Sequence, residues 1–119
     1  IENGANVVYN VAGPAGLGTL KAAADSDKYA IGVDSNQNGI HPDNVLASMV
    51  KQIGNSIYNS IEQIKAGEAE FGKVKVFGLE DEGVALMYND TIVPEQVKAQ
   101  IEAAEAKVTS GEIEVDSAF

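Results

Sequence analysis

Residues 5–34 contain, in order, an apolar stretch, a glycine-rich turn, a helical pattern and a second apolar stretch. Residues 5–12 (ANVVYNVA) predict a buried strand, which runs directly into the turn at residues 13–18 (GPAGLG). Leucine and alanine then recur at helical spacing up to about residue 25, and residues 29–34 (YAIGVD) predict a second strand. A strand, a crossover helix and another strand at this spacing favour a parallel pair with a right-handed connection. The sequence therefore predicts an open α/β sheet.

The middle of the chain has two interpretations. Six apolar residues between positions 46 and 64 follow helical spacing, which predicts one helix from a cap at Asp43 to Ala66, closed by Gly67. Residues 45–50 (VLASMV) could equally form a short strand, with the helix beginning near Gln52. Periodicity over six residues cannot decide between these two structures.

The second half of the chain predicts more strands and one more helix. Residues 73–79 (KVKVFGL) alternate in polarity, and residues 84–88 (VALMY) also suit a strand. Pro94 is placed at a helix start, and an apolar stripe follows it up to Gly111. Ile113 and Val115 predict a last short strand at residues 113–115.

Composition excludes several classes of protein. The 119 residues suit one domain, and a formal charge of −10 with only 8 basic residues, all lysine, disfavours binding to nucleic acid. The longest uncharged stretch, residues 4–20, is broken by Asn, Gly and Pro and is too polar to cross a bilayer. Without cysteine, disulfides, thiolate metal sites and thiol catalysis are also excluded.

The chain begins with Ile1 and not with Met, and its first residues lack the pattern of a signal peptide. We interpret it as a processed product or as a piece of a longer protein. Such a piece would carry only part of a binding site.

Two candidate site positions lie where strands of an open α/β sheet end, which is where ligands bind in such sheets. Gly13 follows the first strand, and glycines there allow backbone N–H groups to approach a ligand. Asp34 ends the second strand, and a carboxylate can accept two hydrogen bonds from the vicinal diol of a ribose. The simpler alternatives are that the glycines only build a tight turn and that Asp34 only caps the following loop.

Other sites fit the sequence less well. The glycines at residues 13, 16 and 18 do not follow the G-x-G-x-x-G spacing of a dinucleotide site, and no acidic residue near the end of the first strand could hold the Mg²⁺ of a receiver domain. The single histidine, His41, lies in a polar loop without a nucleophile motif. The acidic turn at residues 80–82 lacks the ligand spacing of a calcium loop. We therefore expect no enzyme activity, no metal site and no cofactor.

Several motifs together resemble the C-terminal part of the basic membrane protein family, which comprises the purine-nucleoside-binding lipoproteins of ABC importers. The resemblance covers nearly all of this chain but only about the last third of a family member. Tyr58 and the segment at residues 76–84 extend it. The motifs that carry it are GANVVYNVAG (residues 4–13), GLG (residues 16–18), AIGVDSNQ (residues 30–37) and VLASMVK (residues 45–51).

The resemblance implies part of a type I periplasmic-binding-protein fold, a mostly parallel sheet flanked by helices, in which two lobes close over a ligand. Residues 1–44 and 75–119 would then belong to the C-terminal lobe. Residues 45–74 would cross the hinge as a strand, followed by a helix that packs in the N-terminal lobe missing from this chain. Residues 74–79 would return from that lobe as a strand.

The resemblance also implies a function and three ligand-binding residues. Gly13 stands where the family's glycine-rich turn approaches the nucleoside, Asp34 where a carboxylate binds ribose hydroxyls, and Lys51 where a lysine near the hinge reaches the ligand. Without the resemblance, Lys51 would be read as a solvated lysine beside a helix. Asn36 stands where many relatives carry Asp.

We therefore expect the solute-binding component of an ABC importer, anchored outside the cytoplasm by an N-terminal lipid that is absent here. Its partners would be a purine nucleoside, an ABC permease and the missing N-terminal lobe, and the chain alone could self-associate. The alternative is the Rossmann-like nucleotide-binding part of a cytosolic enzyme.

Overall fold

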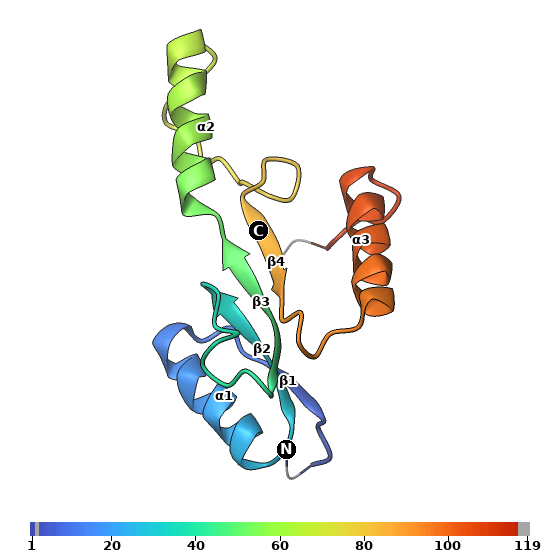
Figure 1. Cartoon of the computed structure of the whole chain (residues 1–119). Helices are drawn as coiled ribbons and strands as arrows, with labels where there is room; N and C mark the ends of the chain where they lie inside the picture. The colour runs from blue at the N-terminus through green and yellow to red at the C-terminus, as the bar shows by residue number, and fades with distance from the viewer. Residues whose placement is uncertain (2, 117–119) are drawn as a thin grey trace.

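The computed structural model describes residue 1 and residues 3–116 of the chain. Four strands form one sheet in the order of the chain, namely β1 (Val7–Tyr9), β2 (Tyr29–Asp34), β3 (Val45–Lys51) and β4 (Val84–Tyr88). The first three strands are parallel to one another, and β4 is antiparallel to β3. The predicted fold class, a mostly parallel sheet flanked by helices, is confirmed (Figure 1).

The core lies between the sheet and the first helix. A 3₁₀ turn at Gly13–Ala15 leads into α1 (Gly16–Asp25), which crosses from β1 to β2 as predicted. Small and branched side chains from the helix and from two strands are fully buried there and exclude water from this face of the sheet. These side chains are Leu20, Ala23, Ala30 and Val45, with Ile1 and Val8 packed at the margin.

β1 is shorter than the strand predicted over residues 5–12, because the chain leaves the sheet after Tyr9. The next residue, Asn10, is buried, and its side chain lies against Gly16 at the start of α1. A Cβ atom on Gly16 would lie only 1.8 Å from the Asn10 Oδ1 atom. Asn10 therefore packs against the start of α1 and takes no part in the sheet.

The ambiguity in the middle of the chain is resolved in favour of a strand followed by a helix, so the single long helix is wrong. β3 pairs with β2 on one side and with β4 on the other, which satisfies backbone groups that a helix would have paired internally. The amide of Gln52 donates to the carbonyl of Gly83 at 2.8 Å, and α2 (Ile53–Ala66) begins at the next residue. Gly67 ends this helix with a φ of 75°, as predicted.

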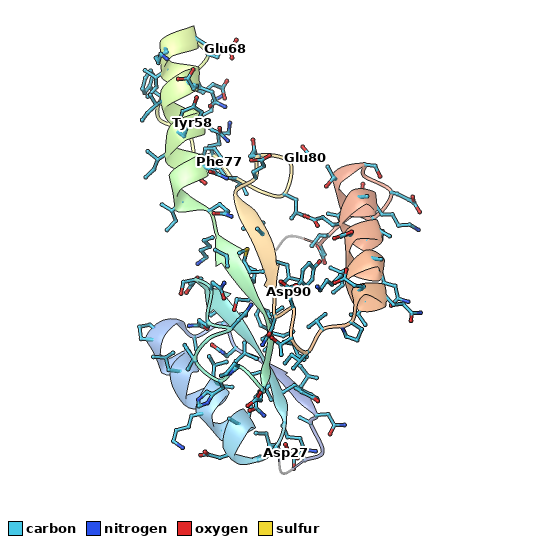
Figure 2. All side chains as sticks on the ribbon, in the orientation of Figure 1. Asp27, Tyr58, Glu68, Phe77, Glu80 and Asp90 are labelled. Carbon is cyan, nitrogen blue, oxygen red and sulfur yellow. The ribbon has the colours of Figure 1, made fainter. Side chains whose placement is uncertain are left out.

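α2 extends away from the sheet (Figure 1) and contains no buried residue. The radius of gyration is 16.8 Å, whereas a compact chain of this length has about 13.5 Å. Figure 2 shows side chains standing free around α2, with Tyr58 labelled among them. An apolar face of four isoleucines is thus 50–64% exposed along the helix, at positions Ile53, Ile57, Ile61 and Ile64.

The strand predicted for residues 73–79 is wrong, because the described segment forms turns and extended backbone without a strand partner. Val74 is 94% exposed and Val76 is 80% exposed, so the alternating apolar residues cover no core. The short strand predicted at residues 113–115 is also absent from the described part of the chain. Alternation alone does not make a strand, which requires a neighbour for its backbone hydrogen bonds.

The last helix, α3 (Glu95–Thr109), begins after Pro94 and ends before Gly111, as predicted. It lies beside β4 (Figure 1), and its main polar link to the rest of the chain is Lys98. The ammonium of Lys98 is bonded to Asp90, in the loop after β4 (Figure 2), and to Glu95 at the start of the helix. An ion cluster thus attaches α3 to the end of β4.

Candidate functional site

The candidate site lies at the carboxyl ends of β1, β2 and β3. A pocket of about 290 Å³ opens between the turn that starts α1 and the end of β2. Gly13 and Asp34 both line it, so the structure places two of the three sequence-predicted residues around one hollow. The other lining residues are Pro14, Leu17, Val33, Ser35 and Gln37.

Gly13 forms the wall of this pocket on the α1 side. Its φ of 52° lies in the left-handed region, which side chains other than Gly, Asn and Asp rarely adopt. No atom lies within 4 Å of the position that a Cβ would take, so space is not what requires glycine here. The backbone conformation requires it, and it leaves the surface of the turn open to a ligand.

Asp34 has an unusual backbone conformation for a residue with a side chain. Its φ is 70°, and the amide of Ser35 donates to the carbonyl of Val33 at 2.9 Å. This hydrogen bond across a residue of positive φ closes a γ-turn of the rare, strained kind. Backbone strain of this sort costs of order 1–3 kcal/mol and is concentrated at functional sites. The strained turn lies at the last residue of β2, which still pairs with Val50 of β3.

Lys51, the third predicted residue, lies next to Asp34. The ammonium of Lys51 is 2.7 Å from the Asp34 Oδ1 atom, and both side chains are about half exposed. Asp34, first through a hydrogen bond and then through its charge, raises the pKa of Lys51 above its usual value of 10.5. The Asp34 Oδ1 atom is itself covered, while the side chain as a whole is 43% exposed. Asp34 can therefore accept hydrogen bonds from a ligand while Lys51 neutralises its charge.

Tyr9, at the end of β1, lies near Lys51 but does not line the pocket, and the sequence analysis gave it no role. The electrostatic influence of its phenol is the smallest of the effects that raise the pKa of Lys51. Its side chain is 50% exposed, so it offers an aromatic surface at the same edge of the sheet. The available signal was its position as an aromatic residue in the apolar stretch that precedes the glycine-rich turn.

Gln37 is a second residue to which the sequence analysis gave no role. It was noted only as the last letter of the AIGVDSNQ motif, yet it lines the pocket and its Oε1 atom accepts the amide hydrogen of Val33 at 3.0 Å. The signal that could have found it was a glutamine three residues after the strand-ending Asp34.

The remaining candidates are less informative. Among the residues that the structure describes, no group of three or more His, Asp or Glu side chains is placed to hold a metal ion. His41 lies in the loop before β3, where its carbonyl accepts the amides of Asn44 and Val45. No helix within residues 3–116 is both long and apolar enough to span a membrane.

Solved structures share this fold. A transcriptional activator of the comK gene from Bacillus halodurans aligns with a TM-score of 0.82 and 20% identity, over 94% of this chain and 39% of that one. A solute-binding protein of an ABC transporter system from Aeropyrum pernix K1 aligns with a TM-score of 0.73 and 20% identity, over 99% of this chain and 42% of that one. The fold is thus an α/β unit of the kind found in ABC solute-binding proteins.

Sequence comparison shows the family. The family model described as "ABC transporter substrate-binding protein PnrA-like" (Bmp) matches residues 1–118, and the chain belongs to this family. Basic membrane protein A of Borreliella afzelii is 29% identical over 115 residues, which are 94% of this chain and 35% of that protein. Basic membrane protein D of Borreliella burgdorferi is 31% identical over 94 residues, which are 76% of this chain and 28% of that protein.

The resemblance to basic membrane proteins is therefore confirmed, and the chain spans about a third of the length of these relatives. The family is one of substrate-binding proteins, a class that is typically not enzymatic. Membership favours the binding-protein hypothesis over a Rossmann-like part of a cytosolic enzyme.

Proposed function

We propose that this chain forms the C-terminal part of the solute-binding component of an ABC importer, and that the complete protein binds a purine nucleoside between two lobes. Membership in the substrate-binding family supports the general function. The single observation that carries the ligand class is Asp34, whose carboxylate is held in a strained turn, paired with Lys51 and open at the pocket.

The three residues fit different parts of a nucleoside. The open carboxylate of Asp34 suits the two adjacent hydroxyls of a ribose, because each hydroxyl can donate to a charged acceptor. Lys51 adds a donor at the hinge end of β3, and the Gly13 turn lets the ligand approach the backbone closely. Binding of this kind requires no covalent step, metal ion or cofactor.

We also propose how the chain is divided between the two lobes. Residues 1–44 and 75–119 would form the C-terminal lobe, and residues 45–74 would cross the hinge and enter the N-terminal lobe. The exposed isoleucine face of α2 supports this division, because such a face is stable in water only when something covers it. A hollow of about 620 Å³ between α2 and residues 68–76 lies on the same side of the hinge.

The relatives' greater length supports the presence of further polypeptide that could supply that lobe. In the complete protein, a ligand that contacts both lobes would favour the closed state by its higher affinity for it. The closed form would deliver the nucleoside to an ABC permease, and an N-terminal lipid would hold the receptor at the outer face of the cell membrane.

Isothermal titration calorimetry on the full-length gene product tests the proposal. We expect purine ribonucleosides such as adenosine, guanosine or inosine to bind, and uridine to bind more weakly because its smaller base fills less of a purine site. The absence of binding to all four nucleosides by a folded protein would overturn the proposed ligand class. Family membership would stand in that case.

A further inference from the structure

The amide of Val33 lies where β2 has lost its neighbour. β1 ends at Tyr9, which is opposite Ile31, so the last residues of β2 have no partner strand on that side. The Val33 amide donates instead to the Gln37 Oε1 atom at 3.0 Å. A glutamine side chain thus replaces the missing strand at the residue that precedes Asp34.

The backbone of Gln37 is held in turn by a buried residue of β3. The amide of Gln37 donates to the hydroxyl of Ser48 at 2.9 Å, and that hydroxyl donates to the Asn38 Oδ1 atom at 2.7 Å. The Asn38 side-chain amide then donates to the carbonyl of Met87 in β4 at 3.0 Å. Ser48 is fully buried, so its hydrogen bonds are protected from competition with water.

Gly32 makes the space for this arrangement. A Cβ atom at that position would lie 2.7 Å from the Ser48 hydroxyl oxygen and 2.8 Å from the Gln37 Oε1 atom. Any side chain on residue 32 would push the glutamine away from β2. The glycine and the glutamine of the AIGVDSNQ motif are therefore parts of one structural unit.

Val33 connects this unit to the strained turn at Asp34. The Val33 amide is held by Gln37, while the Val33 carbonyl accepts the amide of Ser35 and closes the γ-turn. A strained conformation persists only where the surrounding structure fixes it from several sides. Gln37 fixes the residue on which the turn is built.

We propose that Gln37 is a positioning residue, which holds the turn at Asp34 and so aims the Asp34 carboxylate at the ligand. This inference rests on the proposed function, because it assigns Gln37 to the ribose-binding role of Asp34. Gln37 acts through Asp34, so its loss should weaken binding to ligands that carry the ribose hydroxyls and should spare ligands that lack them.

The test uses Gln37→Leu in the full-length gene product, because leucine keeps most of the volume and removes the acceptor. Calorimetry measures binding of inosine and of its 2′,3′-dideoxy analogue. We expect about tenfold weaker binding of inosine, because the displaced Asp34 carboxylate would lose about one hydrogen bond to the ribose, and less than a twofold change for the analogue. Gln96→Leu, an exposed substitution on α3, serves as the matched control and should change neither affinity.

A double substitution separates positioning from a structural role. In an Asp34→Asn background, Gln37→Leu should change inosine binding by less than about twofold, because the contact through which Gln37 acts is already lost. Equal weakening of both ligands, or an unchanged affinity for inosine, would overturn the proposal. If Gln37→Leu does not fold, Ser48→Ala can replace it, because this substitution removes the hydrogen bond to the Gln37 amide. Ser48→Ala should weaken binding of inosine more than binding of the dideoxy analogue, by a smaller factor than Gln37→Leu.

Amide hydrogen exchange tests the role of Gln37 without any ligand, so this inference and the proposed function can fail separately. A wild-type protein that binds no nucleoside would overturn the proposed function. Even then, the exchange rate of the Ser35 amide measures how often the turn at Asp34 opens. This rate should rise in Gln37→Leu and stay unchanged in Gln96→Leu. An unchanged rate in Gln37→Leu would contradict any role of Gln37 in holding Asp34.

Discussion

At the scale of single residues, Asp34 combines a charge with a backbone conformation that few residue types tolerate. Aspartate and asparagine adopt positive φ more readily than other non-glycine residues, so Asp34 suits both the turn and the site. Substitutions can separate these two properties. Alanine removes the carboxylate and is strained in the turn, whereas asparagine removes only the charge.

We expect Asp34→Ala to weaken binding of a purine nucleoside to the full-length protein by about 2–4 kcal/mol, because ligand hydroxyls would be left without their charged acceptor. Asp34→Asn should also weaken binding. Its melting temperature should fall less below that of the wild type than the melting temperature of Asp34→Ala does. Calorimetry and thermal unfolding measure the two effects. Asp43→Asn, an exposed change in the following loop, is the control. An unchanged affinity in folded Asp34→Ala would reduce Asp34 to a loop cap.

Lys98 attaches α3 to the loop after β4. Its ammonium lies 2.6 Å from the Glu95 Oε1 atom, is bonded to Asp90 and lies 6.0 Å from the centre of the Tyr88 ring. We expect Lys98→Met to leave two carboxylates facing each other and to raise amide exchange in α3 about tenfold. Hydrogen exchange with mass spectrometry measures this change. Lys107→Met, which breaks only an exposed pair with Glu112, should leave the start of α3 unaffected.

At the scale of elements, α2 differs from α1 in what covers its apolar face. α1 buries Leu20 and Ala23 against the sheet, whereas no residue of α2 is buried. Each isoleucine of that face is worth about 1.5–3 kcal/mol when fully buried. Within the described residues, nothing buries the apolar face of α2.

We expect the isolated 119-residue chain to self-associate through α2 and to bind nucleosides weakly or not at all. Ile57→Glu and Ile61→Glu should shift it toward monomer, because a charge on each side chain opposes burial of that face. Light scattering with size-exclusion chromatography measures the mass. Glu62→Gln, on the same helix, is the control. A well-folded monomer with micromolar nucleoside affinity would contradict the two-lobe proposal.

At the scale of the whole molecule, two lysines in ion pairs and one partly buried tyrosine, Tyr88, give a common response to alkaline pH. The hydrogen bonds that Lys51 and Lys98 donate to carboxylates raise the pKa of each lysine, and burial raises the pKa of Tyr88 above its usual value of 10.0. Each group therefore binds its proton more tightly in the folded state than in the unfolded one. The stability they contribute is present below about pH 10 and is lost as pH rises through the raised values.

We expect the free energy of unfolding of the full-length protein to fall from about pH 10 upward, as measured by urea denaturation between pH 8 and pH 11. Lys51→Met and Lys98→Met should each flatten this decline, because each removes one of the responsible groups. Lys65→Met, on the exposed end of α2, is the control. A wild-type curve that is flat above pH 10, or equal slopes in all three variants, would contradict the assignment.

The strand, glycine turn, helix and strand of residues 5–34 could be predicted from the sequence, because these elements depend on local propensity and on turn chemistry, although β1 is shorter than predicted. The sequence also placed the helix stops at Gly67 and Gly111, where glycine adopts the left-handed backbone. The motifs of the family located Gly13, Asp34 and Lys51, and the structure brings these three together. Their role toward a ligand stays a prediction.

The remaining features could not be predicted in this way, because they depend on partners that are distant in sequence. Residues 45–51 became a strand because β2 and β4 lie on both sides, while residues 73–79, with a cleaner alternation, have no strand beside them. The positive φ of Asp34 and its pairing with Lys51 depend on contacts that periodicity does not encode. Likewise, Gln37 gained a role only because β1 ends at Tyr9 and leaves the Val33 amide without a strand to bond.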